Sequence, residues 1–328
     1  MKTLRYLSSL MLFALLVTGV TIISGCNKSD SVTGTSTSVN DYITGEAVNA
    51  SDGSNADDNE ALGTQVTDYE DGSATFDNDG SGVPLDSVRK YGRRVTNVNT
   101  NVNITIDSDT LKTVLVTKTI TGNFVIVGFT AGVVDSVVKP YTEVQHRVAY
   151  FKRVNTTGTP RADWRLYQFS VVDGETTAPQ AGKSNIVMNK IEIYNGGVLA
   201  YTLNGPDFTT NLFTTKYFND AVIPRFHRGD VLHVKVYLNS NQTDPDIVAY
   251  HWARNSFGFH REPFAMTSQT INGSTYDRVY EKEFTVFNNH KIGIFNGMIS
   301  ANTKASLWNN NLGLFSSTYA GLPYRIRL

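Results

Sequence analysis

Cysteine is almost absent from this sequence, because Cys26 is the only one among its 328 residues. A single cysteine excludes an intramolecular disulfide, so cysteine cross-links do not stabilise the fold. Any thiol chemistry in the protein depends on that one residue.

The sequence also lacks the short motifs of common enzymes. It contains no Gly-x-Ser-x-Gly nucleophile motif, no His-Glu-x-x-His zinc motif and no glycine-rich phosphate loop after a predicted strand. Its six histidines are scattered, which favours separate surface positions over a metal site. We therefore expect no catalysis, no metal ion and no cofactor. Carboxylates that meet only in the fold, such as Glu262 with Glu281 or Glu283, leave a hydrolase as a further alternative.

Positive charge is thinly spread, and no run of Lys or Arg is longer than Arg93-Arg94. The absence of a basic stripe or nucleic-acid-binding motif predicts that the protein does not bind nucleic acid. Negative charge, by contrast, is concentrated between residues 27 and 83, which hold twelve Asp or Glu and a single lysine. Residues 84–328 carry 26 Lys or Arg against 18 Asp or Glu.

The acidic stretch is rich in Ser, Thr, Gly and Asn and has little apolar surface with which to form a core. We therefore predict a flexible acidic tether over residues 26–83. Within it, Leu62, Val66 and Tyr69 have helical spacing, which predicts a short helix over residues 57–71.

The tether also contains a partial calcium-loop pattern. Asp77, Asp79 and Ser81 place oxygen atoms at the first, third and fifth positions of such a loop, and Gly82 occupies the sixth. The twelfth position, where a bidentate Glu belongs, is Val88. A solvated acidic turn is therefore the favoured interpretation, with a calcium site as the weaker alternative.

The first 26 residues have the pattern of an export signal. Lys2 and Arg5 precede an apolar run over residues 10–17, and small residues directly precede Cys26. The stretch Ile23-Ser24-Gly25-Cys26 resembles the lipobox of bacterial lipoproteins, which reads aliphatic, small, small, Cys. That resemblance implies that residues 1–25 are a signal peptide, that Cys26 receives a diacylglyceryl thioether, and that its new amine is acylated, for example by palmitate.

The same resemblance implies a location. Lipid on Cys26 would tie the protein to a membrane of the bacterial cell envelope. Asn27 stands where the enteric inner-membrane retention signal has Asp, which favours the outer membrane. The alternative is an uncleaved helical anchor over Tyr6–Ile23, which has 18 residues but is diluted by Ser, Thr and Gly.

From Val83 onward the sequence changes to short runs in which apolar and polar residues alternate. Val102, Ile104 and Ile106 are one example, and Gly, Pro or Asp separate most of the runs. This alternation, together with 16 Tyr, 17 Phe and many Val, Ile and Thr, predicts a mainly β protein. We expect two β-rich domains, over residues 84–180 and 183–328.

The second region has the sharper pattern. A Gly229-Asp230 turn opens the alternating stretch 231–238, and the next predicted strand contains Trp252. These features resemble bacterial immunoglobulin-like domains, which implies an antiparallel β-sandwich over residues 183–328. The cysteine pair of antibody domains is absent from this sequence.

Aromatic residues gather between residues 250 and 264. The predicted binding residues are Trp252, Phe257, Phe259 and His260, because aromatic faces on a loop stack on sugar rings or anchor a protein partner. The alternative is that these rings belong to the core. We expect a lipid-anchored envelope protein that presents β domains for binding, adhesion or assembly, with envelope proteins or glycans as partners. A glycan-binding or carbohydrate-active surface lipoprotein that uses loop 250–264 is the alternative.

Overall fold

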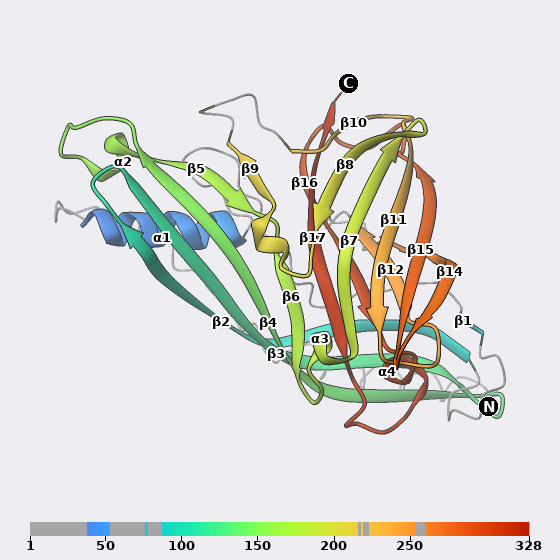
Figure 1. Ribbon diagram of the computed structural model, residues 1–328. Helices are drawn as coiled ribbons and strands as arrows, with labels where there is room; N and C mark the ends of the chain where they lie inside the picture. The colour runs from blue at the N-terminus through green and yellow to red at the C-terminus, as the bar shows by residue number, and fades with distance from the viewer. Residues whose placement is uncertain are drawn as a thin grey trace, which may run out of the picture. The chain divides into compact units, whose positions relative to one another are not determined.

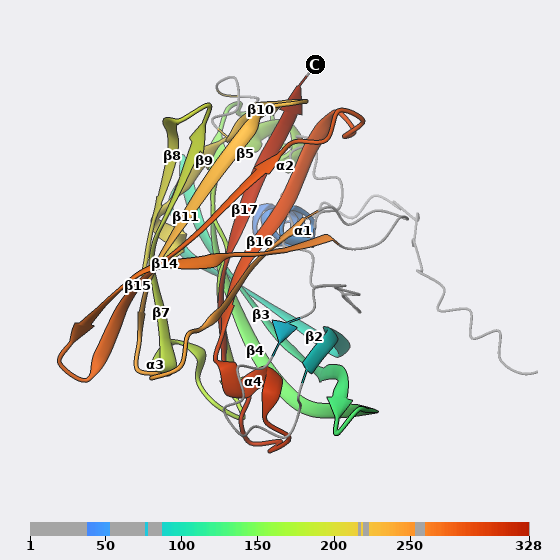
Figure 2. The same ribbon diagram turned by 90° about the vertical axis from the view of Figure 1, so that its right-hand side faces the viewer.

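The computed structural model describes residues 38–52, 76–77, 87–215, 218, 223–252 and 260–327. The chain divides into two units, Met1–Ser36 and Thr37–Leu328, and all described residues lie in the second. They form two sheets, one of twelve strands (sheet A) and one of five strands (sheet B) (Figures 1 and 2). The predicted mainly β class is confirmed.

Sheet A has the strand order β1-β2-β3-β4-β6-β17-β16-β12-β13, and β5, β9 and β10 pair beside that path. Its strands are β1 (Phe76–Asp77), β2 (Ser87–Asp107), β3 (Leu111–Thr130), β4 (Val133–Arg153), β5 (Trp164–Ser170), β6 (Asp173–Ala178), β9 (Leu212–Thr214), β10 (Arg225–His227), β12 (Ile247–Trp252), β13 (His260–Pro263), β16 (Gly293–Asn302) and β17 (Ser317–Arg327).

Sheet B has the strand order β14-β15-β11-β7-β8. Its strands are β7 (Ile186–Asn195), β8 (Val198–Asn204), β11 (Val231–Ser240), β14 (Ala265–Asn272) and β15 (Thr275–Thr285). The helices are α1 (Val39–Asp52), α2 (Pro160–Asp163), α3 (Gly182–Asn185) and α4 (Lys304–Trp308), and a 3-10 turn spans Phe208–Thr210.

Strands β2, β3 and β4 form a long antiparallel meander of 21, 20 and 21 residues. A tight turn joins β3 to β4, in which Ala131 and Gly132 have φ values of 50° and 78°. Along its other edge β4 pairs first with β6, through residues 142–146, and then with β5, through residues 149–153. The meander therefore supports two different groups of strands, one after the other.

Helix α1 corrects the prediction of a flexible tether, because Val39–Asp52 lies inside the range assigned to it. Ile43 and Ala47 are buried against the meander, and they recur at helical spacing. Ser38 caps the helix: its Oγ accepts a hydrogen bond from the Asp41 amide at 3.1 Å. A few apolar residues at the right spacing were enough to fold this part of an acidic stretch.

A second core lies under the other half of the meander, where the segment around α4 covers it. Lys139 enters this core and is fully buried. Its Nζ donates to the carbonyl oxygens of Ala305, Ser306 and Leu314 at 2.8–3.0 Å. Burial lowers the pKa of Lys139 to about 8. The lysine thus holds α4 and the chain before β17 against β4.

Sheet B faces β17, β16 and β12, and side chains from both layers meet in the main core (Figure 1). The alternation predicted for residues 231–238 is present in β11, whose inward side chains are buried. These are Leu232, Val234, Val236 and Leu238. The packed part of the molecule is therefore compatible with a β-sandwich.

The two regions predicted as separate domains share one sheet. β6, from the first region, pairs with β17, from the second, through Asp173, Gly174 and Glu175. Gly174 leaves room for the ring of Tyr319, its partner on β17, because a Cβ at that position would lie 2.2 Å from the ring. Sheet A is continuous across the expected boundary near residue 180.

Several predictions fall on residues outside the described part of the chain. These are the signal peptide, the lipidated Cys26, the helix over residues 57–71, and Asp79 and Ser81 of the calcium-loop pattern. The backbone of Asp77 pairs with Ser87 in the β1–β2 ladder. No described helix combines the length and the apolar character that crossing a membrane would require.

Candidate ligand pocket

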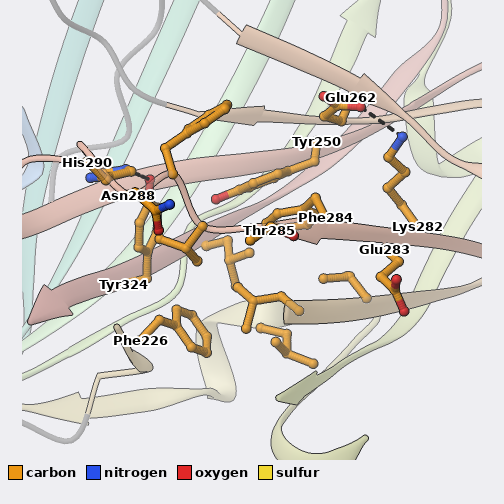
Figure 3. A pocket seen from close by; sticks show the side chains of 16 residues that line it. Phe226, Tyr250, Glu262, Lys282, Glu283, Phe284, Thr285, Asn288, His290 and Tyr324 are labelled. Carbon is orange, nitrogen blue, oxygen red and sulfur yellow. Dashed lines mark hydrogen bonds and ion pairs between the residues drawn. The ribbon is translucent and has the colours of Figure 1, made fainter. Parts of the chain in front are cut away.

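A cavity of about 470 Å³ lies between the two sheets of the sandwich, near the end of β15 (Figure 3). It falls within the usual volume range of small-molecule sites, which are concave, mostly apolar and contain a few polar groups. Strands of both sheets and the segment that follows β15 line it.

The sheet B wall follows from the alternation of β7, β11 and β15. Leu232 pairs with Phe284, and Val234 pairs with both Lys282 and Ile193. Residues that pair directly across antiparallel strands point to the same face, so these side chains all face the pocket. The wall is apolar except for Lys282.

The sheet A wall is formed mainly by Tyr250 of β12 together with Leu322 and Tyr324 of β17. Gly297 of the intervening strand β16 makes room for the Tyr250 ring: a Cβ there would lie 2.5 Å from the ring edge. The ring consequently lies over the sheet and stacks on Phe284 of the opposite wall, with centroids 5.4 Å apart and planes at 21°. This pair joins the two sheets beside the cavity.

An ion pair also connects the two walls. Lys282 Nζ of β15 lies 2.8 Å from a Glu262 carboxylate oxygen of β13 (Figure 3). Both side chains are about one-third exposed, at 30% and 33%. Such a partly solvated pair contributes little to stability. Its main effect here is to satisfy a lysine that the strand alternation directs inward.

Three side chains with polar ends, His290, Tyr324 and Tyr250, lie along one side of the pocket. His290 Nε2 lies 3.3 Å from the Tyr324 hydroxyl, within hydrogen-bonding distance. Figure 3 shows the Tyr250 hydroxyl directed toward the side of the pocket that holds His290 and Asn288. Burial is the main cause that raises the pKa of both tyrosines, so both are neutral phenols at physiological pH.

The structure describes only the backbone of two predicted binding residues, Trp252 and His260, which pair with each other at the ends of β12 and β13. Their side chains, and all of Phe257 and Phe259, lie outside the described part. Two neighbouring rings of the aromatic stretch, Tyr250 and Phe264, are buried. The prediction for this loop therefore stays a prediction.

The structure does not bring Glu262 and Glu281 together as a carboxylate pair. Glu281 lies on the outer face of β15, where it contacts His233 at 2.7 Å and Lys235 at 3.2 Å. Figure 3 shows the Glu283 carboxylate directed away from Glu262. Within the described residues, no group of three or more His, Cys, Asp or Glu is placed to hold a metal ion.

Sequence reasoning missed most of the pocket residues, including Phe226, Phe284, His290 and Tyr324. They come from four segments that only the fold brings together. One signal was present in the sequence: Lys282 stands between Tyr280 and Phe284 at every second position of a predicted strand. A charged residue on the apolar face of a strand needs a polar partner there, which distinguishes the position from its apolar neighbours.

The chain was also compared with known proteins. No protein-family model matches it, and neither the curated proteins nor the solved structures gave a match.

Proposed function

We propose that this chain is a lipid-anchored cell-envelope protein that binds a small, largely apolar molecule between the two sheets of its β-sandwich. The observation that carries the binding role is the cavity of about 470 Å³, lined by aromatic and aliphatic side chains from both sheets. A packed sandwich core ordinarily fills such a space with side chains. No catalytic step is part of the proposal.

Gly297 supports the interpretation of the cavity as a built site. A methyl group at this position would push the Tyr250 ring toward the cavity, because it would meet the ring at 2.5 Å. The glycine thus keeps open a space that a larger residue would close. In a sandwich without a ligand site, the simplest inner face would carry side chains at every inward position.

The location rests on the first 26 residues. The positive start, the apolar run and the stretch Ile23-Ser24-Gly25-Cys26 together support export and acylation of Cys26. We further propose that the sandwich is of the bacterial immunoglobulin-like kind, which the Gly229-Asp230 turn before β11 and Trp252 in β12 support. Folds of this kind host many functions, so the fold alone does not choose among binding, adhesion and assembly.

Calorimetry with naphthalene and 2-naphthol would test the proposed binding of a small apolar molecule. The full chain would be held in lipid nanodiscs, with empty nanodiscs as the blank. We expect saturable binding of both probes to the wild type and at least tenfold weaker binding to Gly297→Ala. Gly45→Ala is the matched control, because its added Cβ would meet no atom within 4 Å. If neither probe bound, the cavity would not be a binding site.

Two further measurements test the proposed acylation of Cys26 and the glycan-binding alternative. Radiolabelled palmitate is expected to label the wild type but not Cys26→Ser, and an unlabelled wild type would contradict acylation. The glycan alternative predicts oligosaccharide binding that is lost in Phe257→Ala and Phe259→Ala but unchanged in Gly297→Ala. That pattern would move the binding site from the pocket to the loop.

A further inference from the structure

The outer edge of β2 is the longest unpaired strand edge in the described part of the chain. On one side β2 pairs with β3 along its whole length, whereas on the other side only β1 pairs, at Ser87 and Val88. No described strand pairs with that second side from Val95 to Ile106, which we call the β2 edge. Alternate residues of an antiparallel strand direct both backbone groups to one side. About half of these residues therefore present an N–H and a C=O that no described strand receives.

Helix α1 lies over one face of this part of the meander, where it packs against β2, β3 and β4. Val102 and Ile104 turn toward that face, because both pack against the core that contains Ile43 and Ala47 of α1. Successive side chains of a strand point to opposite faces, so Asn103 and the asparagines in step with it turn to the other face. The helix thus covers a face of β2 and does not pair along its edge.

The β2 edge lacks the features that ordinarily keep strand edges from pairing, which are charged side chains, proline and β-bulges. Residues 95–106 contain no charged residue and no proline. From Asn97 to Ile104 the ladder with β3 continues for eight residues without a shift in register. The two edge strands of sheet B are less regular, because a shift in register leaves five consecutive pairs in β14 and four in β8.

The sequence of the regular stretch is a palindrome. Asn97-Val98-Asn99-Thr100-Asn101-Val102-Asn103 reads the same in both directions. If two copies of this strand meet antiparallel about a two-fold axis at Thr100, every residue lies opposite an identical one. The pairs are Asn97 with Asn103, Val98 with Val102, Asn99 with Asn101, and Thr100 with itself. A two-fold interface must be self-complementary, and this strand is so at all seven positions.

The paired side chains suit one another chemically. An asparagine amide both donates and accepts, so two opposed asparagines can form hydrogen bonds without repulsion between like charges. On the other face Val98 is 47% exposed, and Val102 of the second copy would cover it. A two-fold axis perpendicular to the sheet also leaves helix α1 of both copies on the same face, away from the joined edges.

We propose that two copies of this chain pair antiparallel through their β2 edges, in register about Thr100, so that sheet A continues from one copy into the other. An extended segment of another protein would need only the free backbone groups, whereas the palindrome has a use only when the strand meets itself. The pocket takes no part in this contact, so the proposal stands independently of ligand binding.

Disulfide cross-linking tests both the contact and its register. Full-length Cys26→Ser chain in detergent micelles carries a single cysteine once Thr100→Cys is added. Directly opposite residues of antiparallel strands have Cα atoms about 4.5–5.5 Å apart, which a disulfide can bridge. We therefore expect Thr100→Cys to give a covalent dimer on mild oxidation.

Val98→Cys and Val102→Cys are the matched controls for the register. Neither should cross-link alone, because two copies of either position lie about 14 Å apart along the paired strands. When the two variant chains are mixed, position 98 of one should cross-link to position 102 of the other. Mass spectrometry of the linked peptides identifies the pair.

Sedimentation in density-matched micelles measures the association of the Cys26→Ser chain without a cross-link. The double substitution Asn99→Lys and Asn101→Lys sets like charges opposite each other, so the dimer should dissociate about tenfold or more readily. Ser268→Lys with Thr270→Lys, on the exposed edge strand β14, is the control and should leave the dimer unchanged. Circular dichroism equal to that of the parent chain shows that each variant folds.

The proposal would be overturned by a chain that stays monomeric up to about 100 µM and gives no Thr100→Cys dimer. That result would leave the β2 edge to a segment of the same chain or to another protein. Cross-linking of Val98→Cys alone as readily as Thr100→Cys would contradict the register. A dimer that survives Asn99→Lys with Asn101→Lys but dissociates in the β14 variant would place the interface on sheet B.

Discussion

The inner face of β15 carries two cations, Arg278 and Lys282, in very different surroundings. Arg278 is 1% exposed and makes five hydrogen bonds, four of them to the β11–β12 loop and Asp246. Lys282, four residues further along the same strand, has one ion pair with Glu262 and borders a cavity. Polar contacts close the sandwich around Arg278, whereas a cavity borders Lys282.

The difference shows what a buried charge can do in such a layer. At Arg278 the loop carbonyls of Gln242, Thr243 and Asp244 are gathered around one guanidinium, so the charge fixes the position of the chain. At Lys282 the charge is paired with Glu262 of the other sheet, and a cavity lies beside it among the described residues. The first arrangement stabilises the fold, whereas the second leaves room for a ligand.

The largest expected effect is a loss of unfolding free energy when the buried cation Arg278 is removed. Arg278→Met should lower the free energy of unfolding by about 3–5 kcal/mol, because it leaves Asp246 buried without its cation. Lys282→Met at the pocket should change it by about 0–1 kcal/mol, because its pair is partly solvated. Urea denaturation of the two variants measures the contrast. Equal losses would contradict the distinction between the two parts.

Gly297→Ala should have the next largest effect. The added methyl group overpacks the Tyr250 ring, which should cost about 1–3 kcal/mol of unfolding free energy. Gly45→Ala, in helix α1, should be neutral or slightly stabilising, since its Cβ meets open space and alanine favours helix. Thermal unfolding of both variants gives the comparison, and an unaffected Gly297→Ala would mean that the Tyr250 ring moves freely.

Replacing a tyrosine by Phe should give a smaller difference in unfolding free energy between the part around Arg278, which contains Tyr280, and the pocket, which contains Tyr324. The Tyr280 hydroxyl accepts the Asp246 amide at 2.8 Å in a fully buried position. Tyr280→Phe leaves that N–H without its acceptor and should cost about 1–2 kcal/mol. Tyr324→Phe, on the pocket wall, should cost about 0.5–1 kcal/mol, because water in the open cavity can replace the lost hydroxyl. If the denaturant midpoint fell further in Tyr324→Phe than in Tyr280→Phe, the pocket would be the more tightly packed of the two parts, contrary to this expectation.

The smallest expected effect concerns salt. Raising the salt concentration to about 1 M shortens the screening distance to about 3 Å, which weakens partly exposed pairs first. The stability difference between the wild type and Glu262→Gln should therefore shrink toward zero in high salt. The corresponding difference for Asp246→Asn should remain, because both side chains of its pair with Arg278 are fully buried. Unfolding at low and at high salt distinguishes them.

The sequence allowed the local pattern of the fold to be predicted, but not its connections. Alternation identified the inward face of β11, and the β-rich composition identified the class. The pairing of β6 with β17 joins residues more than 140 positions apart, and no local signal specifies it. This long-range ladder is why sheet A continues across the expected domain boundary.

The candidate site was harder to predict for the same reason. Tyr250 and Glu262 belong to the aromatic stretch noticed in the sequence, but Tyr324 and Phe226 lie on strands far from it. Whether a tyrosine faces a pocket or a filled core depends on one neighbouring residue, Gly297, which shows no pattern of its own. Helix α1 was missed because its two buried residues are few against an acidic background.

The position of β17 has a consequence for how the protein is made. Residues 317–327 occupy the middle of sheet A, between β6 and β16, so neither neighbour has a complete ladder before this strand arrives. A growing chain therefore cannot complete sheet A before residues 317–327 have left the ribosome. Long-range pairing of this kind is slow and postpones folding. If the chain is exported as proposed, it would still be unfolded when an export channel that threads extended polypeptides receives it.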